Sequence, residues 1–388
     1  MTTSPPPAAR PGVPRFGRAR AVAVQTAAAC AATGIAAGGL WGHTLTGTGA
    51  ALLALSLLRR DGRWADHVLR QRLHRDALRA VPHPAPGEDS EGLGLARALL
   101  PALHVTEAPD RNGPPAGVIA DGRGHAVVLR LPGGALPSLP AGPIGRWLEQ
   151  DPARPAAAQL VVEQFGLPPW DLHHRFQPTI AYRQLPQGGA PVAVRSWLVV
   201  RHEPLEHPEA AERRGGGTAG AAAAALSAAH RLRARLDTAG TGITVLGADA
   251  ARALLRDSGD ASPRGRALPG CWAGDAATHC TMTAAVHGEA DWDRLTTALT
   301  GCAADRVVTA ATVTRQGSGQ LRVHTAVRVV STLAQHAAAE RDRLLGAGIV
   351  SPATPDQAAG LLATLPVAHP TKSLAEAIGF ATAAGEPR

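Results

Sequence analysis

Three short stretches of the chain carry residue types at spacings that enzymes use. The first, His202-Glu-Pro-Leu-Glu-His207, is close to the HExxH pattern, in which two histidines one helical turn apart bind zinc and the glutamate acts as a base. Here the histidines are one residue further apart, and Pro204 interrupts any helix that would align them. We therefore expect no metal site at this stretch.

The second stretch, Asp291-Trp-Asp293, has the DxD pattern with which many glycosyltransferases hold a metal ion and a nucleotide sugar. The same residues also suit the start of a helix. Asp291 stands where an N-cap is expected, and the carboxylate of Asp293 would lie near the positive end of the helix dipole. We favour this structural role over a catalytic one.

The third stretch, Arg213-Arg-Gly-Gly-Gly-Thr218, precedes a long helical pattern, and a glycine-rich loop at a helix N-terminus can hold a phosphate group. It lacks the Gly-Lys-Ser/Thr ending of a P-loop, so we favour a flexible connection into the helix. Gly317-Ser-Gly319 predicts a hairpin turn, and no Ser-His-Asp or Cys-His arrangement follows from spacing. The sequence thus predicts no catalytic, cofactor-binding or metal-binding residues, and no cofactor.

The elements that would position these stretches alternate between strands and helices. Strands at 117–120 and 125–131, joined by Asp121-Gly122, predict a β-hairpin. Further strands are predicted at 159–165, 192–201, 243–246, 278–286, 306–315, 321–330 and 348–350. Helices are predicted at 144–150, 219–237, 248–257, 292–299, 333–344 and 355–362, and a loop at 258–270. This pattern predicts an α/β or α+β domain over residues 99–367, with a mixed sheet flanked by helices.

Composition excludes some classes of function. Aromatic residues make up only 3% of the chain, and all the excess positive charge lies in residues 1–80, so the pI of 10.6 does not indicate nucleic-acid binding. Cys30, Cys271, Cys280 and Cys302 form no CxxC pair. We predict that they are reduced thiols, with neither a zinc site nor a disulfide framework.

Residues 21–58 contain no Asp, Glu, Lys or Arg. As one helix, at about 1.5 Å per residue, they would be far longer than the roughly 30 Å core of a bilayer. Polar and glycine residues at 40–44 interrupt the run, so we predict a transmembrane hairpin with helices at about 21–40 and 43–58. Arginines flank it on both sides, which predicts that both termini and the following domain are cytoplasmic. A hairpin buried in a soluble protein is the alternative.

Small residues within this run, Gly34 with Gly38 and Gly47 with Ala51, have the spacing at which membrane helices approach closely. They predict a packing face, either within the hairpin or toward a partner. Around the hairpin we predict a disordered basic segment at 1–20, a basic juxtamembrane helix at 59–80, a linker at 81–98 and a tail at 368–388.

This plan and several stretches resemble the EccE subunits of actinobacterial type VII (ESX) secretion systems. Residues 115–122, running into 125–131, are similar to that family's early strand pair. Arg195-Ser-Trp-Leu-Val-Val200 is similar to its central strand, and Pro208-Glu-Ala-Ala-Glu-Arg-Arg-Gly-Gly-Gly217 to its PEA-x-x-RGGG stretch. Ala363-Thr-Leu-Pro-Val367 is similar to its closing segment. The resemblance covers most of residues 15–367.

The resemblance implies a membrane subunit that is not an enzyme. It implies assembly in the lipid bilayer with EccB, EccD and the FtsK-like ATPase EccC, without nucleic acid, into a complex that exports WXG100-type proteins. It also implies a soluble domain similar to glycosyltransferase-like α/β folds without a known activity. The competing hypothesis is a membrane-tethered, glycosyltransferase-like enzyme that binds a nucleotide sugar.

Overall fold

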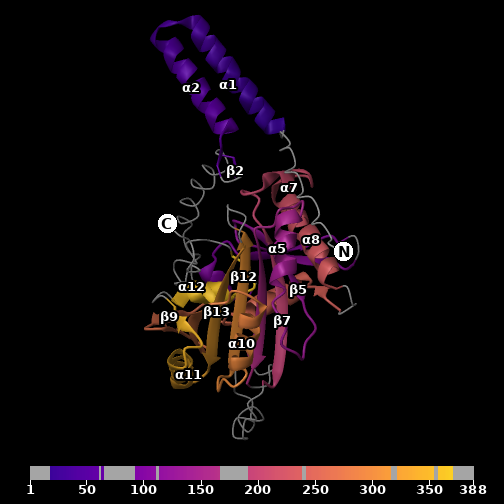
Figure 1. Cartoon of the computed structure of the whole chain (residues 1–388), viewed down its shortest axis with the longest axis vertical. Coiled ribbons are helices and arrows are strands. Elements are labelled where there is room, and N and C mark those ends of the chain that lie inside the picture. The colour runs from indigo at the N-terminus through magenta and orange to yellow at the C-terminus, as the bar shows by residue number, and fades with distance from the viewer. Residues whose placement is uncertain are drawn as a thin grey trace, which may run out of the picture. The chain divides into compact units, whose positions relative to one another are not determined.

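The computed structural model of the chain describes residues 18–60, 63–64, 92–110, 113–166, 191–237, 242–315, 321–353 and 357–369. Contacts divide the chain into two units, Met1–Arg75 and Asp76–Arg388, and each is described by itself (Figure 1). Residues 81–91 of the predicted linker at 81–98, residues 370–388 of the predicted tail at 368–388, most of 1–20, and the Gly317–Gly319 turn lie outside the described residues. The described end of the predicted linker contains the start of a short helix, Leu95–Leu99.

The first unit contains a hairpin of two helices, α1 (Arg18–Ala37) and α2 (Gly39–Leu57). The chain turns at Gly38 and Gly39, which have φ values of 60° and 66°. The turn therefore lies slightly before the interruption predicted at 40–44, because these two glycines adopt the left-handed backbone that other residues avoid.

Small residues hold the two helices together. A Cβ atom on Gly34 would lie 2.5 Å from Thr46 Oγ1 and 2.7 Å from the Gly42 carbonyl oxygen, and one on Gly49 would lie 2.6 Å from Ala31 N. Gly34 therefore packs inside the hairpin, as one of the two predicted alternatives had it. Gly38 instead forms the turn, and a Cβ on Gly47 would meet nothing within 4 Å.

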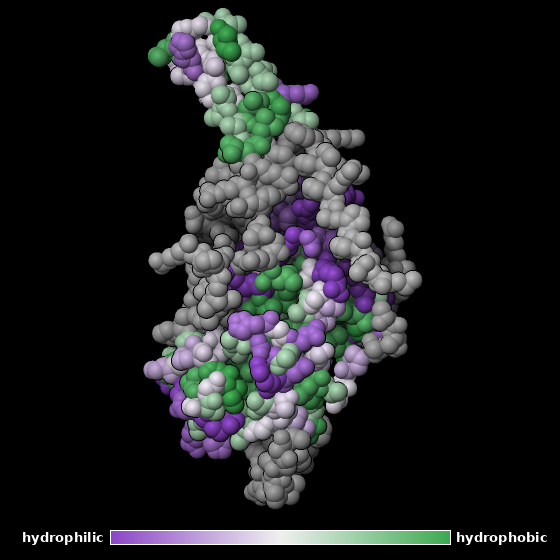
Figure 2. Space-filling view, in the orientation of Figure 1, coloured by the Kyte–Doolittle hydropathy of each residue, from purple (hydrophilic) through white to green (hydrophobic). Residues whose placement is uncertain are grey.

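The hairpin presents its large apolar side chains outward. The exposed ones are Val22, Ile35, Leu40, Trp41, Leu45, Leu52, Leu57 and Leu58. Figure 2 shows the resulting apolar surface along this unit. Small and weakly polar residues pack inside while large apolar ones face out, which is the reverse of a water-soluble pair.

Among the described residues, however, no helix is both long enough and apolar enough to qualify as a membrane span. The transmembrane character that we predicted for the hairpin is therefore not confirmed, because Ala, Gly and Thr dominate both helices. A short antiparallel pair, β1 (Arg59–Arg60) with β2 (Arg63–Trp64), stands where the basic helix was predicted to begin. Residues 65–80 of that predicted helix lie outside the described part.

The second unit is built on one sheet, in which twelve strands are described, in the order β3-β4-β5-β7-β6-β12-β13-β11-β10-β9, with β8 against β5 and β14 against β11. Every described strand pair is antiparallel, so the predicted mixed sheet is wrong. The strands are β3 (His104–Ala108), β4 (Ala116–Ala120), β5 (His125–Arg130), β6 (Ala157–Phe165), β7 (Ala193–His202), β8 (Thr244–Val245), β9 (Gly265–Leu268), β10 (Cys271–Gly274), β11 (Thr278–Ala284), β12 (Arg306–Arg315), β13 (Leu321–Ser331) and β14 (Ser351–Pro352).

Helices cover both faces of this sheet, so the flanking helices were predicted correctly. One face carries α5 (Ala141–Gln150), α8 (Gly217–Leu236), α10 (Glu289–Leu299) and α11 (Ala334–Gly346), and the short α7 (Pro208–Glu212) leads into α8. The other face carries α4 (Leu95–Leu99), α9 (Ala248–Ser258) and α12 (Gln357–Thr364). Strand β7 shows why both faces are apolar: Leu198 and Val200 join the first core, and Trp197 and Val199 join the second.

The sheet consists of the same arrangement used twice. In the first half the strand order is β3-β4-β5-β7-β6, and in the second it is β9-β10-β11-β13-β12, with β6 and β12 paired at the centre. The connections also correspond: α5 matches α10, α8 matches α11, β8 matches β14, and α9 matches α12. The two halves are thus repeats related by an approximate two-fold axis between β6 and β12.

Two features of the second repeat differ from the sequence-based expectation. The predicted loop at 258–270 contains β9, which pairs with β10 as an antiparallel hairpin. Cys271 and Cys280 form a disulfide, with their Cα atoms 4.3 Å apart, so the prediction of reduced thiols is wrong for this pair. The physical reason is the strand pairing, which brings together two cysteines that have no diagnostic spacing in the sequence.

Candidate functional site

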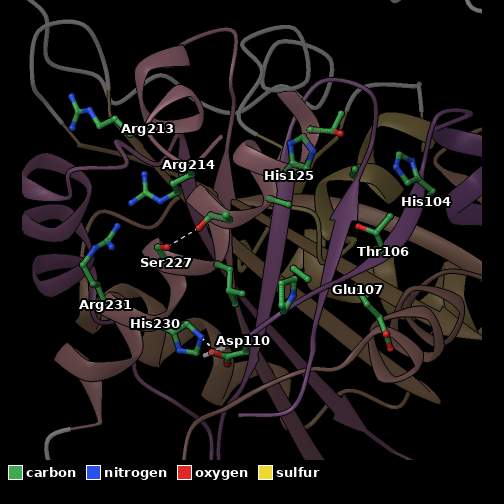
Figure 3. Close-up of a pocket in the computed structure, with 18 residues that line it drawn as sticks. His104, Thr106, Glu107, Asp110, His125, Arg213, Arg214, Ser227, His230 and Arg231 are labelled. Carbon is green, nitrogen blue, oxygen red and sulfur yellow. Dashed lines mark hydrogen bonds and ion pairs between the residues drawn. The ribbon is translucent and has the colours of Figure 1, made fainter. Parts of the chain in front are cut away.

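A pocket of about 1080 Å³ lies in the first repeat, between α8 and the edge of the sheet formed by β3, β4 and β5 (Figure 3). Figure 3 shows Arg213, Arg214 and Arg231 along one side, with His104 and Thr106 along the other. The lining residues are His104, Thr106, Glu107, Ala108, Pro109, Asp110, Ala120, His125, Arg213, Arg214, Thr218, Ala219, Ala222, Ala223, Leu226, Ser227, His230 and Arg231. The glycine-rich stretch that we interpreted as a plain connection therefore forms part of a pocket wall.

The backbone of that stretch explains its three glycines. Gly215, Gly216 and Gly217 have φ values of 100°, 74° and 61°, which side chains with a Cβ rarely adopt. The tight turn connects the end of α7 to the start of α8. A hydrogen bond of 2.9 Å from Gly216 N to the Ala211 carbonyl stabilises it. Helix α8 begins with no side-chain cap and no acidic residue in its first turn. Thr218 and Ala219 of this first turn line the pocket, so the uncapped start of α8 lies beside it.

Positive charge gathers at this end of the pocket. Arg214 donates one hydrogen bond, of 2.8 Å, to the Ala210 carbonyl. Burial and the charges of Arg231 and Arg213 lower its pKa, which shows that the three guanidinium groups repel one another. Arg231 is neutralised by Asp151, through two contacts of 2.7 Å, whereas no described residue forms an ion pair with the exposed Arg213.

The acidic residues of the lining do not offset this charge. Asp110 lies 2.9 Å from Nε2 of His230, and Figure 3 shows the two side chains together. Glu107 also lines the pocket, but Figure 3 shows it on the β3 side, away from Arg213 and Arg214. The end of the pocket beside the start of α8 therefore has a net positive charge.

His125 completes the pocket from β5. Its side chain is 91% buried, because only 9% of its surface is accessible, and its Nδ1 has no hydrogen-bond partner among the described residues. Burial lowers its pKa, so the ring is neutral at pH 7. A neutral ring that lines the pocket and has an unsatisfied nitrogen is suited to bind a polar ligand.

Residues of the HExxH-like stretch take part in the packing of the fold. His202 is fully buried at the end of β7, opposite His125, and burial lowers its pKa to about 4. Glu203 accepts hydrogen bonds from Arg201 Nε at 3.0 Å and from Arg123 Nε at 3.1 Å. Among the described residues no group of three or more His, Cys, Asp or Glu side chains could hold a metal ion.

Glu203 belongs instead to a buried charge network centred on Arg201. Two contacts, of 2.9 and 3.1 Å, join the Arg201 guanidinium to Asp121, and one of 3.2 Å joins it to the Val367 carbonyl. Burial would raise the pKa of Asp121, but the charge of Arg201 holds it well below its usual value. A Cβ on Gly124 would lie 2.6 Å from the guanidinium, so this glycine is needed for the close approach. The sequence contains no motif that would have predicted this network.

The DxD stretch lies at the start of α10, although Asp291 is not the predicted N-cap. Asp291 lies in the first turn of α10, where Gly288 is the N-cap, and it accepts a hydrogen bond of 2.9 Å from His287 N. Its other oxygen accepts a hydrogen bond from Arg294, while Asp293 is exposed. The backbone hydrogen bond from His287 lowers the pKa of Asp291. Neither aspartate lines the pocket.

The pocket has groups suited to binding a ligand. Of its hydroxyl groups, that of Ser227 donates to the Ala223 carbonyl at 2.7 Å, so it is not activated by a base. The uncapped start of α8, two arginines and a neutral histidine are instead the groups that bind anions.

Residues 190–299 match the family described as "EccE: Putative type VII ESX secretion system translocon, EccE". The match begins just before β7 and ends with α10, so it includes the glycine turn and all of α8. No curated protein matches the chain.

Proposed function

The chain belongs to the EccE family through residues 190–299, and on that premise we propose that it is a non-catalytic subunit of a type VII secretion complex. It contributes to the assembly or stability of the machinery that exports WXG100-type proteins. The family match carries this proposal. The polar groups of the matched region support it, because Glu203 and Asp291 are engaged in structural hydrogen bonds.

The partners in this proposal are the other core subunits, EccB, EccC and EccD. The surface that supports such contacts in the first unit is the outward row of large apolar side chains on α1 and α2. Monomeric soluble proteins rarely leave large apolar patches uncovered. We propose that this surface contacts the membrane and the transmembrane segments of the partners. In this proposal α1 and α2 enter the membrane as a packed pair.

The proposed topology has both flanks of the hairpin, and the whole second unit, on the cytoplasmic side of the cell membrane. Arg18 and Arg20 precede the uncharged run, and Arg59 and Arg60 follow it, which supports this orientation. The Cys271–Cys280 disulfide argues in the other direction, because disulfides persist in oxidising compartments. The proposed topology requires this disulfide to be reduced in the cytoplasm, which the labelling below tests.

Co-purification tests the assembly role. A tagged copy of the chain, produced in cells that carry the secretion genes, should recover EccB, EccC and EccD after membrane solubilisation. Gly34→Leu should reduce this recovery several-fold, because the new side chain would collide with α2. Gly47→Leu is the matched control, since a Cβ there meets nothing within 4 Å. If the wild-type chain recovered none of the three subunits, the proposed function would be wrong.

Labelling tests the topology. A membrane-impermeant thiol reagent applied to intact cells should modify a cysteine placed at the exposed Trp41, near the hairpin turn, and should not modify one placed at Gly216. Alkylation before lysis should also trap Cys271 and Cys280 as free thiols. Labelling at Gly216 would place the second unit outside the cytoplasm.

The alternative function, a glycosyltransferase-like enzyme acting on a nucleotide sugar, keeps one supporting observation, the exposed DxD stretch on α10. It makes a separate prediction. Hydrolysis or transfer of a nucleotide sugar by the purified chain, abolished by Asp293→Asn, would establish it in place of the non-catalytic role.

A further inference from the structure

We propose that the pocket between α8 and the β3–β4–β5 edge binds a small molecule through a phosphate or diphosphate group. This inference goes beyond the role in secretion and does not rest on it, because it concerns a ligand of the second unit and not a partner subunit.

The first argument is the start of α8. In most helices a side chain or an acidic residue satisfies the first N–H groups, but α8 has neither. The glycine turn at 215–217 removes every side chain that would cover these donors, and a Cβ at each of the three would meet nothing within 4 Å. A helix of twenty residues thus presents an open, positive N-terminus to a pocket.

The second argument is the charge beside it. Arg213 and Arg214 immediately precede the turn, and both line the pocket. Because the nearby Arg231 already pairs with Asp151, it does not need an anion, whereas the other two lack a carboxylate partner among the described residues. An anion with two or more charges would relieve the repulsion between these guanidinium groups, and phosphate has the geometry that arginine binds best.

The third argument is independent of the helix. His125 reaches the pocket from β5, on the opposite wall, and is nine-tenths buried with Nδ1 unpartnered among the described residues. Figure 3 shows Arg214 and His125 on different sides of the pocket. Buried polar side chains almost always have a partner in native proteins, so a pocket-lining ring without one among the described residues points to a ligand.

The size of the pocket indicates a ligand larger than an inorganic ion. Its volume of about 1080 Å³ lies at the upper end of the roughly 300–1,000 Å³ typical of small-molecule sites. Beyond the positive end, the wall is formed by small and apolar residues of α8, among them Ala222 and Leu226. These surfaces suit the uncharged body of a phosphorylated compound.

The second repeat provides an internal comparison. There α11 takes the place of α8, and Ala337 of that helix packs directly against Cys271 and Cys280. Arg341 covers the same region by donating hydrogen bonds to the Pro269 carbonyl and to Cys271 Sγ. The corresponding space is thus filled in one repeat and open in the other, so the pocket is not a by-product of the scaffold.

Titration of the purified full-length chain with inorganic pyrophosphate, followed by isothermal calorimetry, tests the proposal. We expect saturable binding at one site. Arg214→Gln and His125→Gln should each weaken it about tenfold or more. Gly216→Ala should also weaken it, because the substitution disturbs the turn without removing a charge. Arg235→Gln, at the far end of the same helix, removes an equal charge and should leave the affinity unchanged. Unfolding midpoints measured on each variant separate loss of the site from loss of the fold.

A parallel arm distinguishes the source of the phosphate. Phosphatidylcholine vesicles with and without phosphatidylglycerol are sedimented with the same variants. Binding of pyrophosphate alone supports a soluble phosphorylated ligand, and vesicle binding that depends on Arg214 and His125 supports a lipid phosphate at the same site. The proposal is overturned if pyrophosphate does not bind and vesicle binding is unaffected by these two substitutions, or if Arg235→Gln weakens either interaction as much as Arg214→Gln does. If the Arg214→Gln chain still recovered the secretion subunits, ligand binding and assembly of the complex would be independent. Each of the two proposals could then fail without the other.

Discussion

Replacing Arg201 with Met should destabilise the second unit by about 3–5 kcal/mol, the usual effect of removing one member of a buried ion pair. Only 1% of the Arg201 surface is accessible, and its guanidinium contacts two carboxylates, those of Asp121 and Glu203. A methionine side chain fits the space of the arginine. Both carboxylates, however, stay buried without the positive charge of Arg201 beside them. Because a domain of this size is typically stable by about 5–15 kcal/mol, such a loss is a large fraction of the total.

The expected loss lies in this range and not above it because neither carboxylate is fully abandoned. Asp121 keeps hydrogen bonds from the backbone of Arg123, at 3.1 Å, and of Gly124, at 2.8 Å. Glu203 keeps its contacts with the Arg123 side chain, at 2.9 and 3.1 Å. The lost bond to the Val367 carbonyl adds a smaller effect, since it involves one neutral acceptor.

Urea unfolding followed by near-UV circular dichroism would measure this loss, because Trp147 and Trp292 are fully packed in the core. The matched control is Arg315→Met, which removes an arginine from the exposed pair with Glu149 and should cost at most about 1 kcal/mol. In a double-mutant cycle with Asp121→Asn, the combined loss should be smaller than the sum of the single losses. If Arg201→Met cost no more than the control, the buried network would not stabilise the fold and the reasoning would be refuted.

Three further predictions concern the glycine turn, the disulfide and the histidines. Gly216→Ala should cost about 1–3 kcal/mol in unfolding free energy, since φ is 74° there, whereas Gly301→Ala, in open space without a positive φ, should be near neutral; equal losses would contradict the backbone argument. The oxidised purified chain should be about 2–3 kcal/mol more stable than the chain treated with dithiothreitol, because the disulfide closes a short loop between residues nine positions apart. Stability should fall as the pH drops from about 6.5 toward 4. Burial lowers the pKa of several histidines to about 4, below the unfolded value of about 6.5, so the unfolded chain binds more protons in this window; these are His202, His279, His324 and His369. Thermal melts between pH 7 and 4 would detect it, and a constant melting temperature down to pH 5 would contradict it.

Much of the fold could be predicted because local patterns decided it. The strand at 192–201 alternates apolar residues on two faces, and the structure places β7 there with a separate core on each face. The turn at Asp121-Gly122 predicted the β4–β5 pair, and the helical pattern at 219–237 predicted α8. What failed was the sheet type. Whether neighbouring strands run parallel or antiparallel depends on which strands pair over long distances, and local periodicity does not record this.

The site was harder to predict for a related reason. Residues 213–218 were recognised as a candidate phosphate-binding loop. The sequence of the loop alone, however, gave no reason to prefer phosphate binding over a flexible connection into the helix. Its significance appears only when β3 and β5 place His104 and His125 opposite it, more than eighty residues away in the chain. Strand β3 itself was missed, because only Val105 and Ala108 of its five residues are buried. A pocket assembled from such distant and locally unremarkable residues leaves no spacing for a motif to capture.

The asymmetry between the repeats follows from a few residue choices on a common scaffold. In the second repeat a short helix follows β13 directly, and Ala337 allows it to pack against the Cys271–Cys280 pair, so the helix closes onto the strands. In the first repeat α7 and the three glycines intervene between β7 and α8, and the longer helix begins with its N-terminus uncapped. Along α8 three of the residues that line the pocket are Ala219, Ala222 and Ala223, whose small side chains leave space between the helix and the β3 edge. Closing that space would have required only larger side chains, as in any packed core. That one repeat keeps it open, with arginines and a buried histidine around it, is therefore the strongest reason to look for a ligand there.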